Sequence, residues 1–225
     1  RTSSGEDIGY IRLKQFNANA SREMRQAIKK LESKNVSGYV LDLRSNPGGL
    51  LEASIDIARQ WLNKGIIVST QTRSGIRDIR RANGMALTNR PVVVLVNEGS
   101  ASASEILSGA IQDNNRGLLV GNKTFGKGLV QSVRTLSDGS GLTVTIAKYL
   151  TPNGTDIHKN GIVPNIVTNI KESRRMNLIF EDIGSSKDME YVIAEKALLD
   201  RLIKSLKSKD VNNFKPNRVA LKYVF

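Results

Sequence analysis

Hydrophobic and polar residues recur along this chain with two different periodicities, which predict alternating strands and helices. Short apolar runs between turn residues predict buried strands, and apolar residues three or four positions apart predict amphipathic helices. Strands are predicted over residues 8–16, 38–44, 65–72, 76–82, 91–97, 117–121, 129–136, 141–150 and 155–168, and helices over 20–34, 50–62 and 103–114. This order indicates an α/β domain, to which the later hairpins add antiparallel edges.

The pattern changes after Ile170. Apolar residues at helical spacing from Ser186 to Lys209 predict one amphipathic helix, which we expect to pack on the core rather than to bind a partner. Alternating apolar residues over 214–225 predict a terminal strand. We therefore divide the chain into a core, 1–170, and a C-terminal helical extension, 171–225.

Composition supports a folded protein and limits its classes. The chain has 225 residues, of which 39% are hydrophobic and 24% charged, so it can bury a substantial core. It has no run of eighteen apolar residues, so we predict no transmembrane span. The segment Arg1–Asp7 has no apolar signal region, which predicts a mature form or a fragment. The absence of cysteine is compatible with an extracytoplasmic compartment.

The formal net charge of +13 raises the question of a nucleic-acid or membrane partner. The densest basic segment contains Arg73, Arg77, Arg80, Arg81 and Arg90. No aromatic residues and no nucleic-acid-binding motif accompany it, so we do not expect a nucleic-acid partner. We expect these arginines to face an acidic or carboxylate-bearing substrate, or lipid headgroups at a membrane surface.

Small hydroxyl residues gather where a strand turns into a helix. The segment Asn97–Ile106 follows the apolar run Val92–Val96 and leads into the predicted helix over 103–114. Free N–H groups and the positive end of a helix dipole stabilise developing negative charge, so this is a natural place for a serine nucleophile. The residues alone do not decide among the candidates Ser100, Ser102, Ser104 and Ser108, since each could cap the helix or serve as a small packing residue.

A serine nucleophile needs a base, and two candidates stand out. His158 is the single histidine, in a polar stretch between two turn signals. A lysine can serve instead if burial disfavours its charged form. Lys127 lies between two glycines and beside Phe125 and Leu129, which can exclude water from its amine.

The turn Asn46–Gly49 follows the predicted strand over 38–44. Its glycines can present a backbone N–H to an oxyanion, although a plain strand-to-helix turn is the alternative interpretation. Asp42 and Arg44 border this turn, and we expect them to pair with each other or with the loop in a structural role.

Four blocks of this sequence, in the same order, resemble the signature blocks of the carboxyl-terminal processing proteases, also called tail-specific proteases. The blocks are Leu41–Gly49, Ser100–Glu105, Thr124–Gln131, and Tyr149–Gly154 with Gly161–Asn165. The resemblance covers the chain from about Ile8 to Ile170, with Asn165 standing where the family often has Asp.

The resemblance implies a serine endopeptidase with a Ser-Lys dyad. Ser102 matches the family nucleophile, Lys127 its general base, and Gln131 a glutamine that orients the lysine amine. Residues four apart on a strand share a face, so Lys127 and Gln131 could both point at the serine. Gly48 and Ala103 match the residues whose N–H groups form the oxyanion hole. The family needs no metal and no organic cofactor.

The resemblance also implies a ββα-spiral core like that of the crotonases and the Clp peptidase. Members usually carry a peptide-binding PDZ domain just upstream, which this chain does not include. They act on protein or peptide substrates with free carboxyl-terminal tails, in the bacterial periplasm or the thylakoid lumen. In the photosynthetic branch they trim a photosystem II reaction-centre precursor. The blocks are similar to those of bacterial, including cyanobacterial, members.

Two other functions stay open at this point. A crotonase-like acyl-CoA enzyme would use the same oxyanion architecture but gives no reason for the set Ser102, Lys127 and Gln131. A catalytically silent or peptide-binding fragment would need its PDZ domain. The sequence predicts no oligomeric state.

Overall fold

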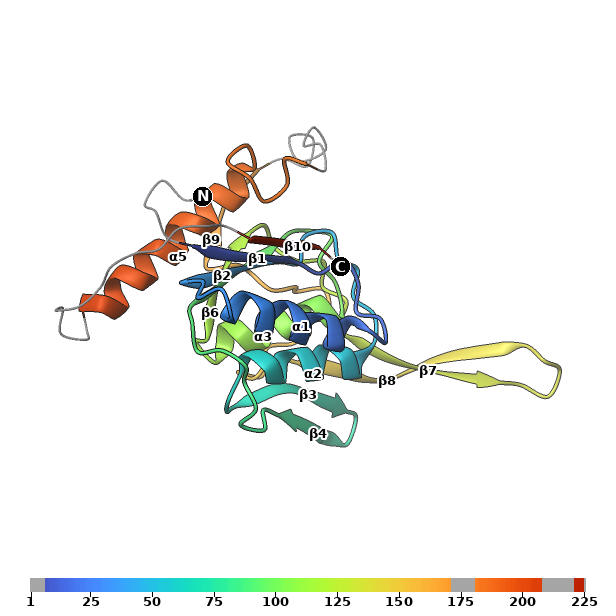
Figure 1. Cartoon of the computed structure of the whole chain (residues 1–225). Coiled ribbons are helices and arrows are strands. Elements are labelled where there is room, and N and C mark those ends of the chain that lie inside the picture. Colours follow the sequence, from blue (N-terminus) through green and yellow to red (C-terminus); the bar gives the residue numbers. More distant parts are fainter. Residues whose placement is uncertain (1–6, 171–180, 208–220, 225) are drawn as a thin grey trace.

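The computed structural model describes residues 7–170, 181–207 and 221–224, which form two sheets with helices packed between and outside them (Figure 1). The strands are β1 (Ile8–Arg12), β2 (Gly38–Asp42), β3 (Ile66–Thr72), β4 (Gly75–Arg81), β5 (Val92–Val96), β6 (Gly117–Gly121), β7 (Leu129–Thr135), β8 (Gly141–Leu150), β9 (Ile166–Val167) and β10 (Leu221–Val224). The helices are α1 (Ala20–Glu32), α2 (Leu51–Trp61), α3 (Ala103–Asp113) and α5 (Met189–Lys207).

The larger sheet is parallel and covered on both faces. Its strand order is β10-β1-β2-β5-β6-β9, and each neighbouring pair is parallel. Successive side chains of a strand point to opposite faces. In β5, Val92, Val94 and Val96 therefore join the core beneath α1, α2 and α3, whereas Val93 and Leu95 join the core beneath α5. This double burial explains why the strand is apolar throughout.

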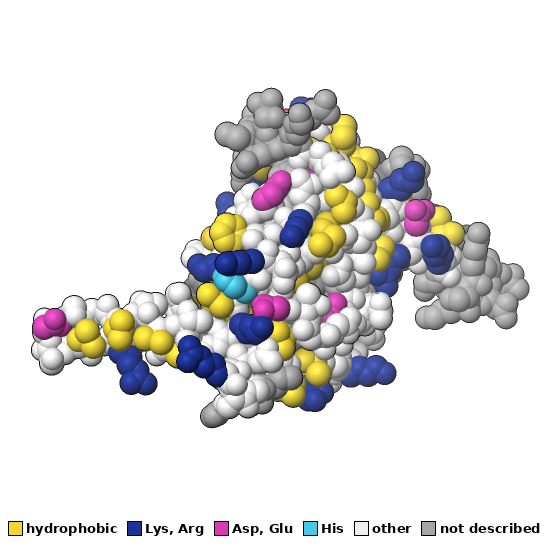
Figure 2. All heavy atoms as spheres, turned by 180° about the vertical axis from the view of Figure 1, so that it is seen from behind, with side chains coloured by type: hydrophobic (Ala, Val, Ile, Leu, Met, Phe, Trp, Pro, Cys, Tyr) yellow, Lys and Arg dark blue, Asp and Glu magenta, His cyan; other side chains and the backbone are white. Residues whose placement is uncertain are grey.

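The smaller sheet is antiparallel, with the order β4-β3-β8-β7. Val68 of β3 and Tyr149 of β8 pack into the core on the helices. The distal parts of β7 and β8 leave the body of the protein as a two-stranded arm (Figure 1). Figure 2 shows apolar side chains along this arm, and the exposed ones are Val133, Leu136, Leu142, Val144 and Ile146.

Most predicted elements are confirmed, but the strand predicted over 155–168 is wrong. Only Ile166–Val167 forms a strand there, and Asp156 makes one isolated bridge to Leu150. Another part of this segment lies against the loop before β7, where the N–H of Lys159 donates to the carbonyl of Gly126 at 2.9 Å. The strand predicted over 8–16 is shorter too, because it ends at Arg12 and continues only as a bridge from Phe16 to Gly49.

The two elements predicted after Ile170 are present in the described residues. The helix predicted over 186–209 corresponds to α5, and positions 208–209 lie outside the described residues. The terminal strand predicted over 214–225 corresponds to β10, which pairs in parallel with β1; positions 214–220 and 225 lie outside the described residues. Within the described ranges, no helix combines the length and hydrophobicity needed to cross a membrane.

Candidate active site

Two loops meet at the carboxyl ends of the parallel strands β2 and β5. Side chains and backbone join them directly: the N–H of Ser45 donates to Asn97 Oδ1 at 2.7 Å, and Ser100 Oγ donates to the carbonyl of Leu43 at 2.8 Å. The N–H of Ala101 donates to the carbonyl of Asn46 at 3.0 Å. These contacts hold the predicted oxyanion turn against the predicted nucleophile segment.

The structure distinguishes the four candidate serines. Ser100, Ser104 and Ser108 are fully buried, and the hydroxyls of Ser100 and Ser104 donate to backbone carbonyls of the other loop. Ser102 is only partly buried and immediately precedes α3. Its backbone has φ of 56° and ψ of −113°, a conformation that costs free energy for a residue with a Cβ and that clusters at functional sites.

Gly48 touches the residues on both sides of Ser102. Its φ is 101°, and a Cβ added there would lie 2.7 Å from the carbonyl oxygen of Ala101 and 2.9 Å from the N–H nitrogen of Ala103. Only glycine fits this approach. The two predicted oxyanion residues are therefore neighbours.

The N–H of Gly48 has a partner that the sequence did not indicate. It donates to Asn46 Oδ1 at 2.9 Å, whereas the N–H groups of Gly49 and Ala103 have no hydrogen-bond acceptor within the described residues. Asn46 is fully buried and also donates from Nδ2 to the carbonyl of Leu13 at 2.8 Å. An oxyanion at Gly48 would share its donor with Asn46, and Gly49 adds a second N–H to the same turn.

Glu105 connects the nucleophile segment to the lysine segment. This carboxylate is fully buried, and all four of its hydrogen-bond partners are donors. Oε1 accepts from Thr124 Oγ1 at 2.6 Å and from the N–H of Gly126 at 2.7 Å. Oε2 accepts from the N–H of Ser102 and the N–H of Lys127, each at 2.8 Å.

The shared oxygen sets the distance between the two predicted catalytic residues. Because the backbone nitrogens of Ser102 and Lys127 both lie 2.8 Å from one oxygen, they are separated by at most twice that length. No role for Glu105 was predicted from the sequence. Its position three residues after Ser102 is the Ser-x-x-Glu spacing of a capping box, a signal that points to the N–H of Ser102 but not to Lys127.

The Lys127 side chain is exposed in this structure, and its Nζ makes no hydrogen bond within the described residues. The expectation that Phe125 and Leu129 exclude water from the amine is wrong here, because the Lys127 side chain is exposed and Phe125 is itself 66% exposed. The structure thus places the backbone of Lys127 beside Ser102 and leaves its side chain exposed.

Gln131 lies on β7 opposite Thr145 and is exposed. Strand alternation does not place Lys127 and Gln131 on one face, since Lys127 precedes β7, which begins only at Leu129. The role assigned to Gln131 stays a prediction.

His158 lies closer to the lysine segment than the sequence indicates. A Cβ added at Gly128 would lie 2.4 Å from the backbone nitrogen of His158, so the two backbones pack directly together. His158 Nδ1 is buried and has no hydrogen-bond partner among the described residues. His158 therefore deserves a variant of its own in any test of the base.

The predicted pairing of Asp42 with Arg44 is confirmed, and the pair belongs to a larger buried ion cluster. Arg44 Nη2 lies 2.6 Å from Asp42 Oδ2 and 2.6 Å from Asp188 Oδ2, and Arg44 Nη1 lies 3.0 Å from Glu190 Oε2. Tyr10 donates its hydroxyl to Asp42 at 2.5 Å. The partners Asp188 and Glu190 were not foreseen from the sequence.

Charge and burial act against each other in this cluster. Burial alone would raise the pKa of Asp42, but the Arg44 charge and hydrogen bonds lower that pKa below its ordinary value. Burial would lower the pKa of Arg44, but Asp42 and Asp188 raise it above its ordinary value. Both groups are therefore charged at neutral pH.

The basic segment is partly neutralised by neighbouring carboxylates. Arg80 pairs with Glu52, and Arg90 Nε lies 3.2 Å from Glu32 Oε2. The side chain of Arg77 lies outside the described residues. Contact of this segment with a membrane or an acidic substrate stays a prediction. Across 7–170, 181–207 and 221–224, no group of three or more potential metal-ligating side chains occurs.

Comparison with known proteins gives one consistent family. Residues 7–168 match the profile of peptidase family S41. The chain is 55% identical over 190 residues to a carboxyl-terminal-processing protease from Synechocystis sp., covering 84% of this chain and 43% of that protein. It is 52% identical over 165 residues to the chloroplastic carboxyl-terminal-processing peptidase 2 of Arabidopsis thaliana, covering 72% of this chain and 32% of that protein.

A solved structure supports the same fold. The photosystem II D1 C-terminal processing protease superposes with a TM-score of 0.74 at 43% sequence identity, covering 82% of this chain and 46% of that protein. The chain thus spans less than half the length of these relatives.

Proposed function

Because the chain belongs to peptidase family S41, we propose that it is the catalytic part of a serine endopeptidase that cleaves proteins near their carboxyl terminus. The observation that carries the proposal is Glu105, whose Oε2 accepts from both Ser102 and Lys127. The strained backbone of Ser102 and its place at the start of α3 support its role as nucleophile.

The proposed reaction is acyl transfer through a Ser-Lys dyad. Neutral Lys127 takes the proton of Ser102 Oγ as this oxygen attacks the peptide carbonyl carbon, and the lysine then protonates the leaving amine. Water, activated by the same lysine, hydrolyses the acyl-enzyme and releases Ser102. In this scheme the exposed side chain of Lys127 turns its amine toward Ser102 when a peptide occupies the site and excludes water, with Gln131 orienting the amine.

The proposed oxyanion hole lies between the turn after β2 and the first turn of α3. The N–H of Ala103 has no hydrogen-bond acceptor in the part of the chain that the structure describes, and it lies in the field of the helix N-terminus. Gly48 approaches it closely enough to complete the hole, with its N–H turning from Asn46 Oδ1 to the oxyanion.

The natural substrate and the location follow from the relatives and are proposals for this chain. The relatives are named for carboxyl-terminal processing, and one of them for photosystem II D1. We propose protein substrates with free carboxyl-terminal tails and a site of action outside the cytoplasm, in the periplasm or the thylakoid lumen. No metal or organic cofactor is required by the proposed reaction.

Cleavage of a peptide with a free apolar carboxyl terminus tests the proposal. We expect cleavage by the parent chain and its loss in Ser102→Ala and Lys127→Ala, with both variants as stable as the parent. His158→Ala is the matched comparison, and it should retain activity if Lys127 is the base. Retained activity in Ser102→Ala or Lys127→Ala would contradict the role of that residue, and loss only in His158→Ala would transfer the role of base to the histidine.

A further inference from the structure

We infer that Asp188 and Glu190 at the start of α5 are positioning residues for the reaction, because they hold Arg44 and thereby the oxyanion turn Ser45–Gly49. The inference rests on the proposed function and assigns a role to the segment that follows the family-matched residues 7–168. The connection from α5 to the oxyanion turn consists of contacts between buried groups.

The first step is the contact between α5 and Arg44. Arg44 Nη1 donates to Asp188 Oδ1 at 2.9 Å, Arg44 Nη2 donates to Asp188 Oδ2 at 2.6 Å, and Arg44 Nη1 also donates to Glu190 Oε2 at 3.0 Å. The first pair is a two-pronged arginine–carboxylate contact, which fixes direction as well as distance. Asp188 and Glu190 are each 1% exposed, so water does not compete for these bonds.

Asp188 is itself held firmly at the N-terminus of α5. The N–H of Tyr191 donates to Asp188 Oδ1 at 3.2 Å and the N–H of Gly184 donates to Asp188 Oδ2 at 3.0 Å. The aspartate thus caps the helix and grips Arg44 with the same two oxygens. Glu190 is tied in turn to Thr168, whose hydroxyl lies 3.1 Å from Glu190 Oε1.

The second step leads from Arg44 to the reactive loops. Asp42 Oδ1 accepts from the backbone N–H of Arg44 at 2.9 Å and from its Nε at 3.0 Å, which fixes the chain at the end of β2. The next residue, Ser45, has φ of 56° and donates its N–H to Asn97 Oδ1. Asn46 follows and accepts from Ala101 and Ser104 on either side of Ser102.

The cost of leaving a buried charge without acceptors explains why Asp188 and Glu190 matter to the position of the oxyanion turn. A buried guanidinium left with Asp42 alone would have no acceptor for Nη1 and only one of the two acceptors of Nη2, and an unpaired buried donor is costly. The side chain would then turn toward solvent and pull the backbone between β2 and Gly48 with it. Displacement of donors by 1 Å at an oxyanion site is enough to slow the chemical step.

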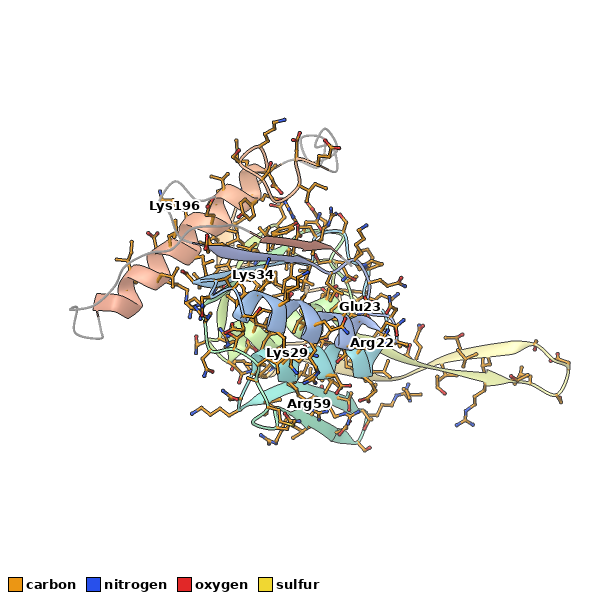
Figure 3. All side chains as sticks on the ribbon, viewed as in Figure 1. Arg22, Glu23, Lys29, Lys34, Arg59 and Lys196 are labelled. Carbon is orange, nitrogen blue, oxygen red and sulfur yellow. The ribbon has the colours of Figure 1, made fainter. Side chains whose placement is uncertain are left out.

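The test compares Asp188→Asn and Glu190→Gln with Leu198→Ala. Leu198 is fully buried on the same helix and packs on the same sheet, but it belongs to the apolar core and not to the ion cluster. Its truncation loosens α5 without touching Arg44. Lys196→Gln, on the outer side of α5 in Figure 3, is the surface control.

We expect kcat for the peptide to fall about tenfold or more in Asp188→Asn, with KM within about twofold of the parent, because the lost interaction acts in the transition state. Affinity for a peptide boronate, whose tetrahedral adduct occupies the oxyanion hole, should fall in parallel. Leu198→Ala should lower the melting temperature at least as much and leave kcat and boronate affinity close to those of the parent.

Equal loss of kcat in Asp188→Asn and Leu198→Ala at matched melting temperature would overturn the inference, and so would unchanged kcat in both carboxylate variants. If the parent chain cleaves nothing, the proposed function fails separately, and amide hydrogen exchange decides the inference. Faster exchange at Ser45, Gly48 and Ala101 in Asp188→Asn than in Leu198→Ala supports it, and equal exchange overturns it.

Discussion

At the scale of single residues, Gly48 is the point where the two reactive loops touch. We predict that Gly48→Ala lowers kcat/KM by about a hundredfold or more, because the added methyl would press on Ala101 and Ala103 where the oxyanion is held. Peptide cleavage measures this effect.

Gly84→Ala is the matched control for backbone strain. Gly84 also has a positive φ, of 80°, but an added Cβ there meets nothing within 4 Å. Its variant should lose some stability and keep its activity. Similar activity losses in the two variants would assign the effect to backbone strain rather than to crowding of the oxyanion hole.

Glu105 gives the second prediction at this scale. Each of its oxygens accepts two donors, so Glu105→Gln turns an amide NH₂ toward donors whichever way it is rotated. We expect a loss of about 2–3 kcal/mol in the free energy of unfolding and a fall in kcat. Denaturant titration and peptide cleavage measure the two. Full activity with lowered stability would show that Glu105 supports the fold without placing Ser102 and Lys127.

Some residues of the candidate site could be predicted from the sequence and others could not, and the difference has a physical reason. The segments that contain Ser102, Lys127 and Gly48 are local patterns, a strand-to-helix turn and glycine-flanked segments, that a sequence displays directly, whereas the choice of Ser102 among the serines came from the family resemblance. Asn46 Oδ1 and the two α5 carboxylates act through contacts that only the folded chain creates. A carboxylate in sequence does not reveal which distant cation it meets.

At the scale of elements, the β7–β8 arm is the part least supported by the core. Residues 133–146 are exposed throughout, although several are apolar. We predict that replacing Arg134–Leu142 by Asn-Gly changes the melting temperature by about 2 °C or less, since exposed positions contribute little to stability. Light scattering should show less aggregation, because exposed apolar area is removed. A large drop in melting temperature would mean that the arm contributes to the fold.

The elements predicted best are those whose pattern has one physical cause. The run Val92–Val96 is apolar because both faces of β5 are buried, so it was recognisable as a strand. The segment over 155–165 carries apolar residues too, but it meets β8 in one isolated bridge only, and its Lys159 N–H and Ile162 carbonyl bond the loop over 124–126. The apolar residues of this segment indicate that it is buried, but they do not indicate that it pairs as a strand.

At the scale of the whole molecule, buried tyrosines make the stability of the packed layers depend on pH. Burial raises the pKa of Tyr10, Tyr39, Tyr149 and Tyr191, four of the chain's five tyrosines, and the adjacent carboxylates of Asp42 and Glu32 add to the effect at Tyr10 and Tyr39. An unfolded tyrosine ionises near its ordinary value of about 10. Since the folded pKa is the higher one, these groups favour unfolding as pH rises above about 10.

We therefore predict that tyrosinate absorbance and loss of circular dichroism appear in one step during alkaline titration. The buried hydroxyls should ionise only as the layers separate. Ionisation of most tyrosines near pH 10 with unchanged circular dichroism would contradict the prediction, because the hydroxyls would then be accessible in the folded protein.

The position of β10 beside β1 has a consequence for synthesis on the ribosome. Gly9 pairs with Leu221, so the two strands are made some two hundred residues apart. Until Leu221–Val224 emerge, β1 offers the cell an unpaired edge to which a neighbouring nascent chain can add. The sheet that carries the reactive loops is completed only after nearly the whole of this chain has been translated.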